Sequence, residues 1–132
     1  MAKQLSGRCY CGKVEYTVAD EFQYAANCYC FNCRRVTGSA FKPFAGIETS
    51  KLSVPKGRGH LMIFGDENNH NAHCRACGSL LYSLVRDGTY VHVAMGTLTD
   101  NPSIRPTEHI FVSTKAPWHE ITDDLPQHQE FG

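Results

Sequence analysis

The residues best suited to chemistry in this sequence are its seven cysteines, which stand in three tight clusters. The spacings are Cys9-x-Cys11, Cys28-x-Cys30-x-x-Cys33 and Cys74-x-x-Cys77. Tetrahedral zinc takes thiolate ligands at about 2.3 Å, and its ligands normally come as close pairs that turns or strand ends bring together. Gly12 and Gly78 directly follow two of the clusters, where a backbone folding around a metal often needs a positive φ. The spacing therefore predicts metal-ligating thiols rather than isolated buried cysteines or disulfides.

These thiols can be divided into a closed four-ligand site and an open three-ligand site in two ways. One division joins Cys9 and Cys11 to Cys74 and Cys77, and leaves Cys28, Cys30 and Cys33 together. The other joins Cys30 and Cys33 to Cys74 and Cys77, and leaves Cys9, Cys11 and Cys28. The first is physically simpler, because its three remaining thiols lie on one segment and converge on an ion with little cost in loop closure. Spacing alone leaves both divisions open.

Length, composition and charge restrict the classes of protein to which the chain can belong. Its 132 residues, 42% of them hydrophobic, fit one domain with a single buried core. Thirteen basic residues balance thirteen acidic ones. The chain therefore lacks the excess of positive charge that is typical of proteins that bind nucleic acid or an anionic membrane surface. The first ten residues contain no apolar signal-peptide core, and no run of about 18 apolar residues predicts a membrane span. We therefore expect a cytoplasmic protein that binds neither nucleic acid nor membrane and keeps its thiols reduced.

The segments that must position the cysteines have the patterns of β-strands. Residues 14–18 alternate apolar and polar side chains directly after the first cluster, which is typical of a half-buried strand. Short runs rich in β-forming residues predict further strands over 22–26, 60–65, 79–85, 89–98 and 109–114. Asp87-Gly88 lies between two of these runs and predicts a hairpin with a type I′ turn, in whose second strand His92 is expected to be structural. No window of ten or more residues has a helical stripe, so we expect one β domain with little helix and a polar end, 121–132, that frays.

Longer motifs place the clusters in a known family. The segments GRCYCGKVEYTV, NCYCFNCRRVTGS, HCRACGS, GTLTD, PTEHIFV and APWHE follow one another in this order. Over residues 5–120 they resemble the glutathione-dependent formaldehyde-activating enzyme family, which includes centromere protein V. The resemblance implies a single all-β, zinc-organised domain of two antiparallel sheets. It also implies two zinc ions per chain, a structural one held by Cys9, Cys11, Cys74 and Cys77, and a second one held by Cys28, Cys30 and Cys33.

An open site of three thiolates predicts a reaction with a small thiol. Three ligands leave one position of tetrahedral zinc free, and a thiol that enters it loses its proton at neutral pH. The resemblance implies glutathione as that thiol and formaldehyde as its electrophile, with S-hydroxymethylglutathione as the product. Cys28, Cys30 and Cys33 would then form the catalytic centre of a carbon–sulfur lyase.

The sequence indicates the residues that would hold the rest of glutathione less clearly than it indicates the cysteine groups. Arg34 and Arg35 follow directly on Cys33, and their guanidinium groups are expected to bind a carboxylate of glutathione. Weaker candidates are Lys42 and Arg75. Family members often carry histidine where this chain has Tyr10 and Tyr29, so neither position can supply an imidazole.

A zinc-ordered module without turnover is the alternative. In such a protein the second site would store metal, sense thiols or stiffen a loop, because one fold and one metal site can serve several chemistries. It predicts either a fourth protein ligand at the second site, or thiol binding without an effect on rate.

Overall fold

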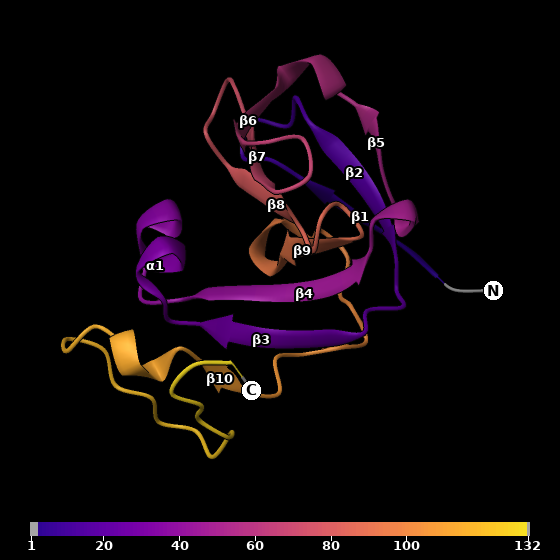
Figure 1. Cartoon of the computed structure of the whole chain (residues 1–132). Coiled ribbons are helices and arrows are strands. Elements are labelled where there is room, and N and C mark those ends of the chain that lie inside the picture. The colour runs from indigo at the N-terminus through magenta and orange to yellow at the C-terminus, as the bar shows by residue number, and fades with distance from the viewer. Residues whose placement is uncertain (1–2, 132) are drawn as a thin grey trace.

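The computed structural model describes residues 3–131, which contain ten strands and one α-helix (Figure 1). The strands form two sheets. In chain order the elements are β1 (Gln4–Arg8), β2 (Glu15–Ala19), β3 (Tyr24–Cys28), α1 (Phe31–Thr37), β4 (Lys42–Glu48), β5 (Leu52–Lys56), β6 (Leu61–Gly65), β7 (His70–Cys74), β8 (Leu80–Val85), β9 (Tyr90–Ala94) and β10 (His109–Ile110). A three-stranded sheet has the order β1-β2-β5, and a seven-stranded sheet has the order β10-β3-β4-β9-β8-β7-β6. Every pair is antiparallel except the short pair of β10 with β3. The expected all-β fold of two sheets with little helix is confirmed.

The main core lies between the two sheets. Along β2, Tyr16 and Val18 are buried, as the alternation of the sequence predicted. They pack with inner side chains of the seven-stranded sheet, among them Ile47 of β4 and Val93 of β9. Full burial of an apolar side chain of this size stabilises the fold by about 1.5–3 kcal/mol. The two sheets therefore form one packed unit.

The predicted hairpin joins β8 to β9, which pair antiparallel. Asp87 and Gly88 have φ of 56° and 84°, as the central positions of a type I′ turn require. The Thr89 N–H donates a hydrogen bond to the Arg86 carbonyl at 3.2 Å and closes this turn. Arg86 also has a positive φ, 52°, so the connection is longer than a two-residue loop. The hairpin is confirmed, with a wider loop than the sequence predicted.

Helix α1 lies at one end of β3 and β4 (Figure 1). It begins at Cys30, whose Sγ accepts a hydrogen bond from the Cys33 N–H at 3.3 Å, and it ends at Gly38, which has a φ of 63°. Its seven residues are too few to show an apolar stripe, so no sequence pattern predicted it. Within residues 3–131, no helix has the length and apolar character needed to cross a membrane.

The C-terminal segment, expected to fray, is instead held against β10. β10 is an edge strand of its sheet, and its free side pairs with the last residues of the chain. The His109 N–H donates to the Pro126 carbonyl at 2.9 Å, and the Phe111 N–H donates to the Glu130 carbonyl at 2.9 Å. Nε2 of the buried His109 lies 2.9 Å from Asp123 Oδ1. An edge strand offers unpaired backbone groups that this segment binds, and the Phe131 ring also packs edge-on against Phe111 at 4.8 Å between centroids.

Candidate metal centres

The four-cysteine group joins the two sheets. Cys9 and Cys11 follow β1 of the three-stranded sheet, whereas Cys74 ends β7 of the seven-stranded sheet and Cys77 lies in the turn before β8. Their Sγ atoms all lie within 4.8 Å of one another, and Cys11 Sγ is 3.6 Å from that of Cys9 and 3.7 Å from that of Cys74. Sulfurs at the corners of a tetrahedral zinc site are about 3.8 Å apart. The group can therefore hold a metal ion that cross-links the sheets.

Each half of this group is a tight turn that a glycine closes. The Gly12 N–H donates to the Cys9 carbonyl at 3.2 Å, and the Gly78 N–H donates to the Cys74 carbonyl at 2.8 Å. Their φ values of 79° and 83° lie in the region that glycine adopts without steric cost. The Val14 N–H also donates to Cys9 Sγ at 3.4 Å, and a backbone N–H in this position stabilises a thiolate. The turn at Cys9 thus places a backbone N–H group beside a cysteine sulfur.

The three-cysteine group lies entirely on the segment that joins β3 to α1. Cys28 is the last residue of β3, Cys30 caps α1, and Cys33 lies in the first turn of the helix. Their Sγ atoms lie within 4.8 Å of one another, so this group too can hold a metal ion. In the part of the chain that the structure describes, no further cysteine, histidine or carboxylate joins them. Of the two divisions that spacing left open, the structure has the first.

A buried lysine faces the three-cysteine group from the neighbouring strand. Lys42 is the register partner of Cys28 in the β3–β4 pair and is only 5% exposed. Its Nζ donates a hydrogen bond to Ser83 Oγ at 3.0 Å, and that Oγ donates to Asn71 Oδ1 at 2.6 Å. A hydrogen bond from Cys28, together with the Lys42 ammonium, lowers the pKa of the Cys33 thiol to about 6. The sequence marked Lys42 only as a weak substrate contact, although its place in an apolar run was a sign of burial.

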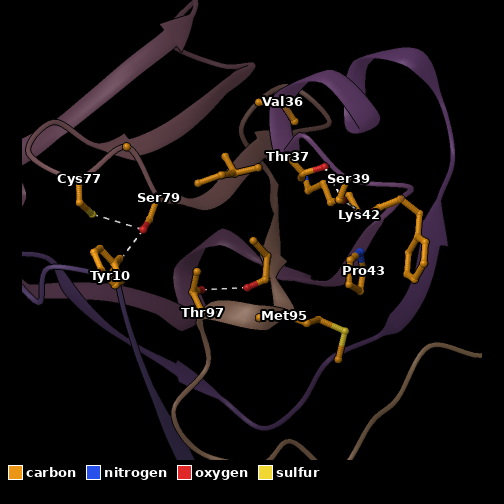
Figure 2. Close-up of a pocket in the computed structure, with 15 residues that line it drawn as sticks. Tyr10, Val36, Thr37, Ser39, Lys42, Pro43, Cys77, Ser79, Met95 and Thr97 are labelled. Carbon is orange, nitrogen blue, oxygen red and sulfur yellow. Dashed lines mark hydrogen bonds between the residues drawn. The ribbon is translucent and has the colours of Figure 1, made fainter.

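A cleft of about 470 Å³ lies between α1 and the turn that carries Cys77 (Figure 2). Val36 of α1 and Lys42 of β4 line one side, and Tyr10 and Cys77 line the other. Besides Tyr10, four residues with hydroxyl groups line the cleft, namely Thr37, Ser39, Ser79 and Thr97. The cleft therefore extends from the helix of one cysteine group to the turn of the other, and it offers hydrogen-bonding groups along the way.

Comparison with known proteins agrees with this arrangement. A family model described as glutathione-dependent formaldehyde-activating enzyme matches residues 4–114, which contain all seven cysteines. The chain belongs to this family. A crystal structure of a Rhodobacter sphaeroides protein is 28% identical to the chain, with 77% of this chain and 98% of that one covered and a TM-score of 0.61. Among curated proteins, none matches the chain significantly.

In this member of the glutathione-dependent formaldehyde-activating enzyme family, the two predicted substrate arginines have different surroundings. Arg34 Nη1 donates to the Thr114 carbonyl at 3.0 Å, which ties α1 to the segment after β10. Arg35 is exposed, and its guanidinium carbon lies 4.9 Å from the centroid of the Phe31 ring. Both arginines follow Cys33 on the same helix, but Arg35 is the freer of the two to meet a ligand. That either binds substrate stays a prediction.

Proposed function

We propose that this chain is a zinc-dependent carbon–sulfur lyase, which binds glutathione through its thiol and speeds the reversible formation of S-hydroxymethylglutathione from formaldehyde. One observation carries the proposal: the three-cysteine group gains no fourth protein ligand within residues 3–131. Membership of the family supports glutathione and formaldehyde as the reactants. We also propose that the protein works in the cytoplasm, where reducing conditions keep its seven free thiols available to metal.

Zinc is the metal that suits both cysteine groups. Thiolate is a soft ligand that favours zinc, and the sulfur–sulfur distances of the four-cysteine group match tetrahedral geometry. We assign a closed structural site to the four-cysteine group and an open site to the three-cysteine group, which makes two zinc ions per chain. Held by Cys28, Cys30 and Cys33, zinc at the open site would lower the pKa of a small thiol at its fourth position, and this thiol would then react as the thiolate.

Residues around the open site would balance its charge and hold the substrate. Three thiolates with one zinc ion carry a net charge of minus one, and the ammonium of Lys42, opposite Cys28, offsets it. Burial lowers the pKa of Lys42, while the negative charges of the neighbouring thiolates favour its charged form. Arg35 would bind a glutathione carboxylate, and the hydroxyl groups of the cleft beside α1 would bind the peptide groups.

The reaction needs neither an oxidant nor a reductant. The sulfur of glutathione forms a bond to the formaldehyde carbon, and the electron pair of the carbonyl goes to oxygen. That oxygen takes up a proton in place of the one that the thiol loses. The protein contributes by holding the thiol as its reactive form beside the aldehyde, since positioning and activation together lower the barrier.

An exchange measurement tests this function. Thiols add to formaldehyde without help, so the informative quantity is the rate relative to the uncatalysed reaction at matched pH and thiol concentration. We expect zinc-loaded protein to raise the rate seen by NMR exchange spectroscopy, Cys33→Ala to abolish the rise, and S-methylglutathione to show no exchange. No rise with fully loaded protein would contradict the enzyme, and glutathione binding without a rise would favour a zinc- and thiol-binding module without turnover.

A further inference from the structure

A second cavity, of about 680 Å³, lies on the face of the seven-stranded sheet that points away from the three-stranded one. The function proposed above does not use it. Its volume falls in the range of small-molecule sites, about 300–1,000 Å³. The lining residues come mainly from β3, β4, β9, the β8–β9 loop and the C-terminal part of the chain: Tyr24, Phe44, His92, Arg86, Ile110 and Phe131.

The floor of this cavity begins beside the three-cysteine group. Side chains alternate along a strand, so Ala26 and Cys28 of β3 lie on the same face. In the β3–β4 register, Ala26 pairs with Phe44 and Cys28 pairs with Lys42, so the two pairs are direct neighbours on that face. Ala26, Cys28 and Phe44 belong to one apolar cluster, against which the other two cysteines also pack. Ala26 and Phe44 also line the cavity, which therefore starts about 7 Å along the strand from Cys28.

Aromatic rings with fixed positions form that floor. The Phe44 ring stacks on His92 with 4.3 Å between the centroids, and the Tyr24 ring meets His92 edge-on at 5.5 Å. Tyr24 Oη and His92 Nε2 are 2.8 Å apart, within hydrogen-bond distance. Burial, helped by the charges of Lys42 and Arg86, lowers the pKa of His92 to about 4, so the ring is neutral near pH 7. The floor is thus an uncharged aromatic surface, made of a stacked pair of rings with the Tyr24 ring standing edge-on beside it.

Charged groups lie at the edges of the cavity. The guanidinium carbon of Arg86 lies 5.1 Å from the ring centroid of Tyr24 and 4.8 Å from that of Tyr90. Tyr24 precedes Cys28 by four positions on β3, so Arg86 marks the end that is about 13 Å from the thiols. Glu108 lines the cavity next to β10. An apolar centre with polar edges is the usual character of a site for a small organic molecule.

Neither reactant of the proposed function matches this cavity. Formaldehyde has two heavy atoms and is close in size to a water molecule, which takes about 30 Å³ of liquid volume. Glutathione carries two carboxylates and an ammonium, and burying these charges on an aromatic floor with one guanidinium would be costly. An aromatic ring, in contrast, gains from burial and from stacking on Phe44 and His92.

We propose, building on the function proposed above, that this cavity binds the aromatic substituent of a larger aldehyde, so that the protein accepts arylalkyl aldehydes such as phenylacetaldehyde as well as formaldehyde. With its ring on Ala26 and Phe44, such an aldehyde directs its carbonyl toward the thiol held near Cys28. The sulfur–carbon bond forms, the carbonyl electron pair goes to oxygen, and that oxygen gains a proton in place of the one lost by the thiol.

Binding is tested apart from turnover. 2-Phenylethanol has the ring but no carbonyl, so its binding to zinc-loaded protein reports on the cavity alone. We expect saturable shifts of the ring NMR signals of Tyr24, Phe44 and His92. Val85→Trp fills part of the cavity, and Ile63→Trp, at a 45% exposed position on β6 outside it, is the matched control. The affinity for 2-phenylethanol should fall at least about tenfold in the first variant and stay unchanged in the second.

Turnover is tested by the ratio of the rate enhancement for phenylacetaldehyde to that for formaldehyde. This ratio should fall at least about tenfold in Val85→Trp and stay at the wild-type value in Ile63→Trp. The inference would be overturned by any of three results: no saturable binding of 2-phenylethanol, an unchanged ratio in Val85→Trp, or displacement of 2-phenylethanol by S-methylglutathione. The proposed function would still stand in each case if the protein speeds the reaction of formaldehyde. Ring binding without enhancement for either aldehyde would overturn the proposed function and the aldehyde assignment together.

Discussion

At the scale of single residues, the cysteines of the two groups differ in their burial and in the elements to which they belong. Cys9 and Cys74 are 1% and 0% exposed and lie at the ends of strands from different sheets. Cys30 and Cys33 are partly buried and lie on one short segment. A metal at the first group resists separation of the sheets, whereas a metal at the second closes a loop of only a few residues, which removes little chain entropy.

Replacement of one thiol in each group should therefore have unequal effects. Cys77→Ala should unfold the domain or lower its melting temperature severely, because structural zinc contributes about 10–16 kcal/mol of apparent binding free energy to folding in comparable small sites. Cys33→Ala should stay folded and bind one zinc ion fewer. Circular dichroism melts and metal analysis with zinc present would compare them. Equal destabilisation would make the second group structural as well, and an unfolded Cys33→Ala beside a folded Cys77→Ala would reverse the assignment.

His92 should make stability depend on pH in a defined window. Its pKa in the folded chain, about 4, is below the ordinary value of 6.5 because of burial and the nearby charges of Lys42 and Arg86. Between these two values the unfolded chain binds a proton that the folded chain does not, so stability falls with decreasing pH, by at most about 1.4 kcal/mol per pH unit. An NMR titration should find the His92 ring neutral at about pH 5, and His92→Gln should remove this part of the slope. A ring that titrates near its ordinary pKa would refute the prediction.

At the scale of elements, β1 approaches β2 closely at a glycine that lies opposite a buried ring. Gly7 is the register partner of Tyr16, and a Cβ at Gly7 would collide with the Tyr16 ring. The ring has little freedom to move, because it is 1% exposed and its Oη contacts Thr97 Oγ1 at 2.7 Å. The backbone of β1 can approach the Tyr16 ring this closely because glycine has no side chain.

Gly7→Ala should accordingly destabilise the domain by about 1–3 kcal/mol, the usual cost of overpacking. Gly59→Ala is the matched control, since a Cβ at that position has no atom within 4 Å. Urea unfolding of the two variants, both loaded with zinc, measures the difference. Equal urea midpoints for the two variants would contradict the prediction and would mean that the Tyr16 ring can move aside to make room for the added methyl group.

Elements that depend on local pattern could be predicted, and elements that depend on tertiary contact could not. β2 and the β8–β9 hairpin follow from alternation and from Asp87-Gly88, which act within a few residues. Helix α1 depends on the cap at Cys30, and its seven residues carry no periodic signal. The pairing of residues 126–130 with β10 uses backbone groups, which side-chain patterns do not report. Burial of Lys42 follows from the register of β3 with β4.

At the scale of the whole molecule, the two cysteine groups lie at different places in the fold. The four-cysteine group joins β1 to the β7–β8 turn and thereby the three-stranded sheet to the seven-stranded one. The three-cysteine group belongs to the segment where β3 leads into α1, two elements that Figure 1 shows side by side. The aromatic cavity starts next to this group. The spacing of the sequence singled out the seven thiols that the structure brings into two groups able to hold a metal ion. Their division between the groups depends on how the sheets pack: loop closure only favoured it, and the family resemblance predicted it.

Cadmium NMR tests most directly whether one site is closed and the other is open to a thiol. Cadmium, a thiophilic ion of the same charge as zinc, should give two signals from the substituted protein, one of which is lost in Cys33→Ala. Addition of glutathione should shift that signal alone, and S-methylglutathione should shift neither, because it has no thiol proton to lose. The account would be contradicted if saturating glutathione left both signals in place, or if it moved the signal of the four-cysteine group instead.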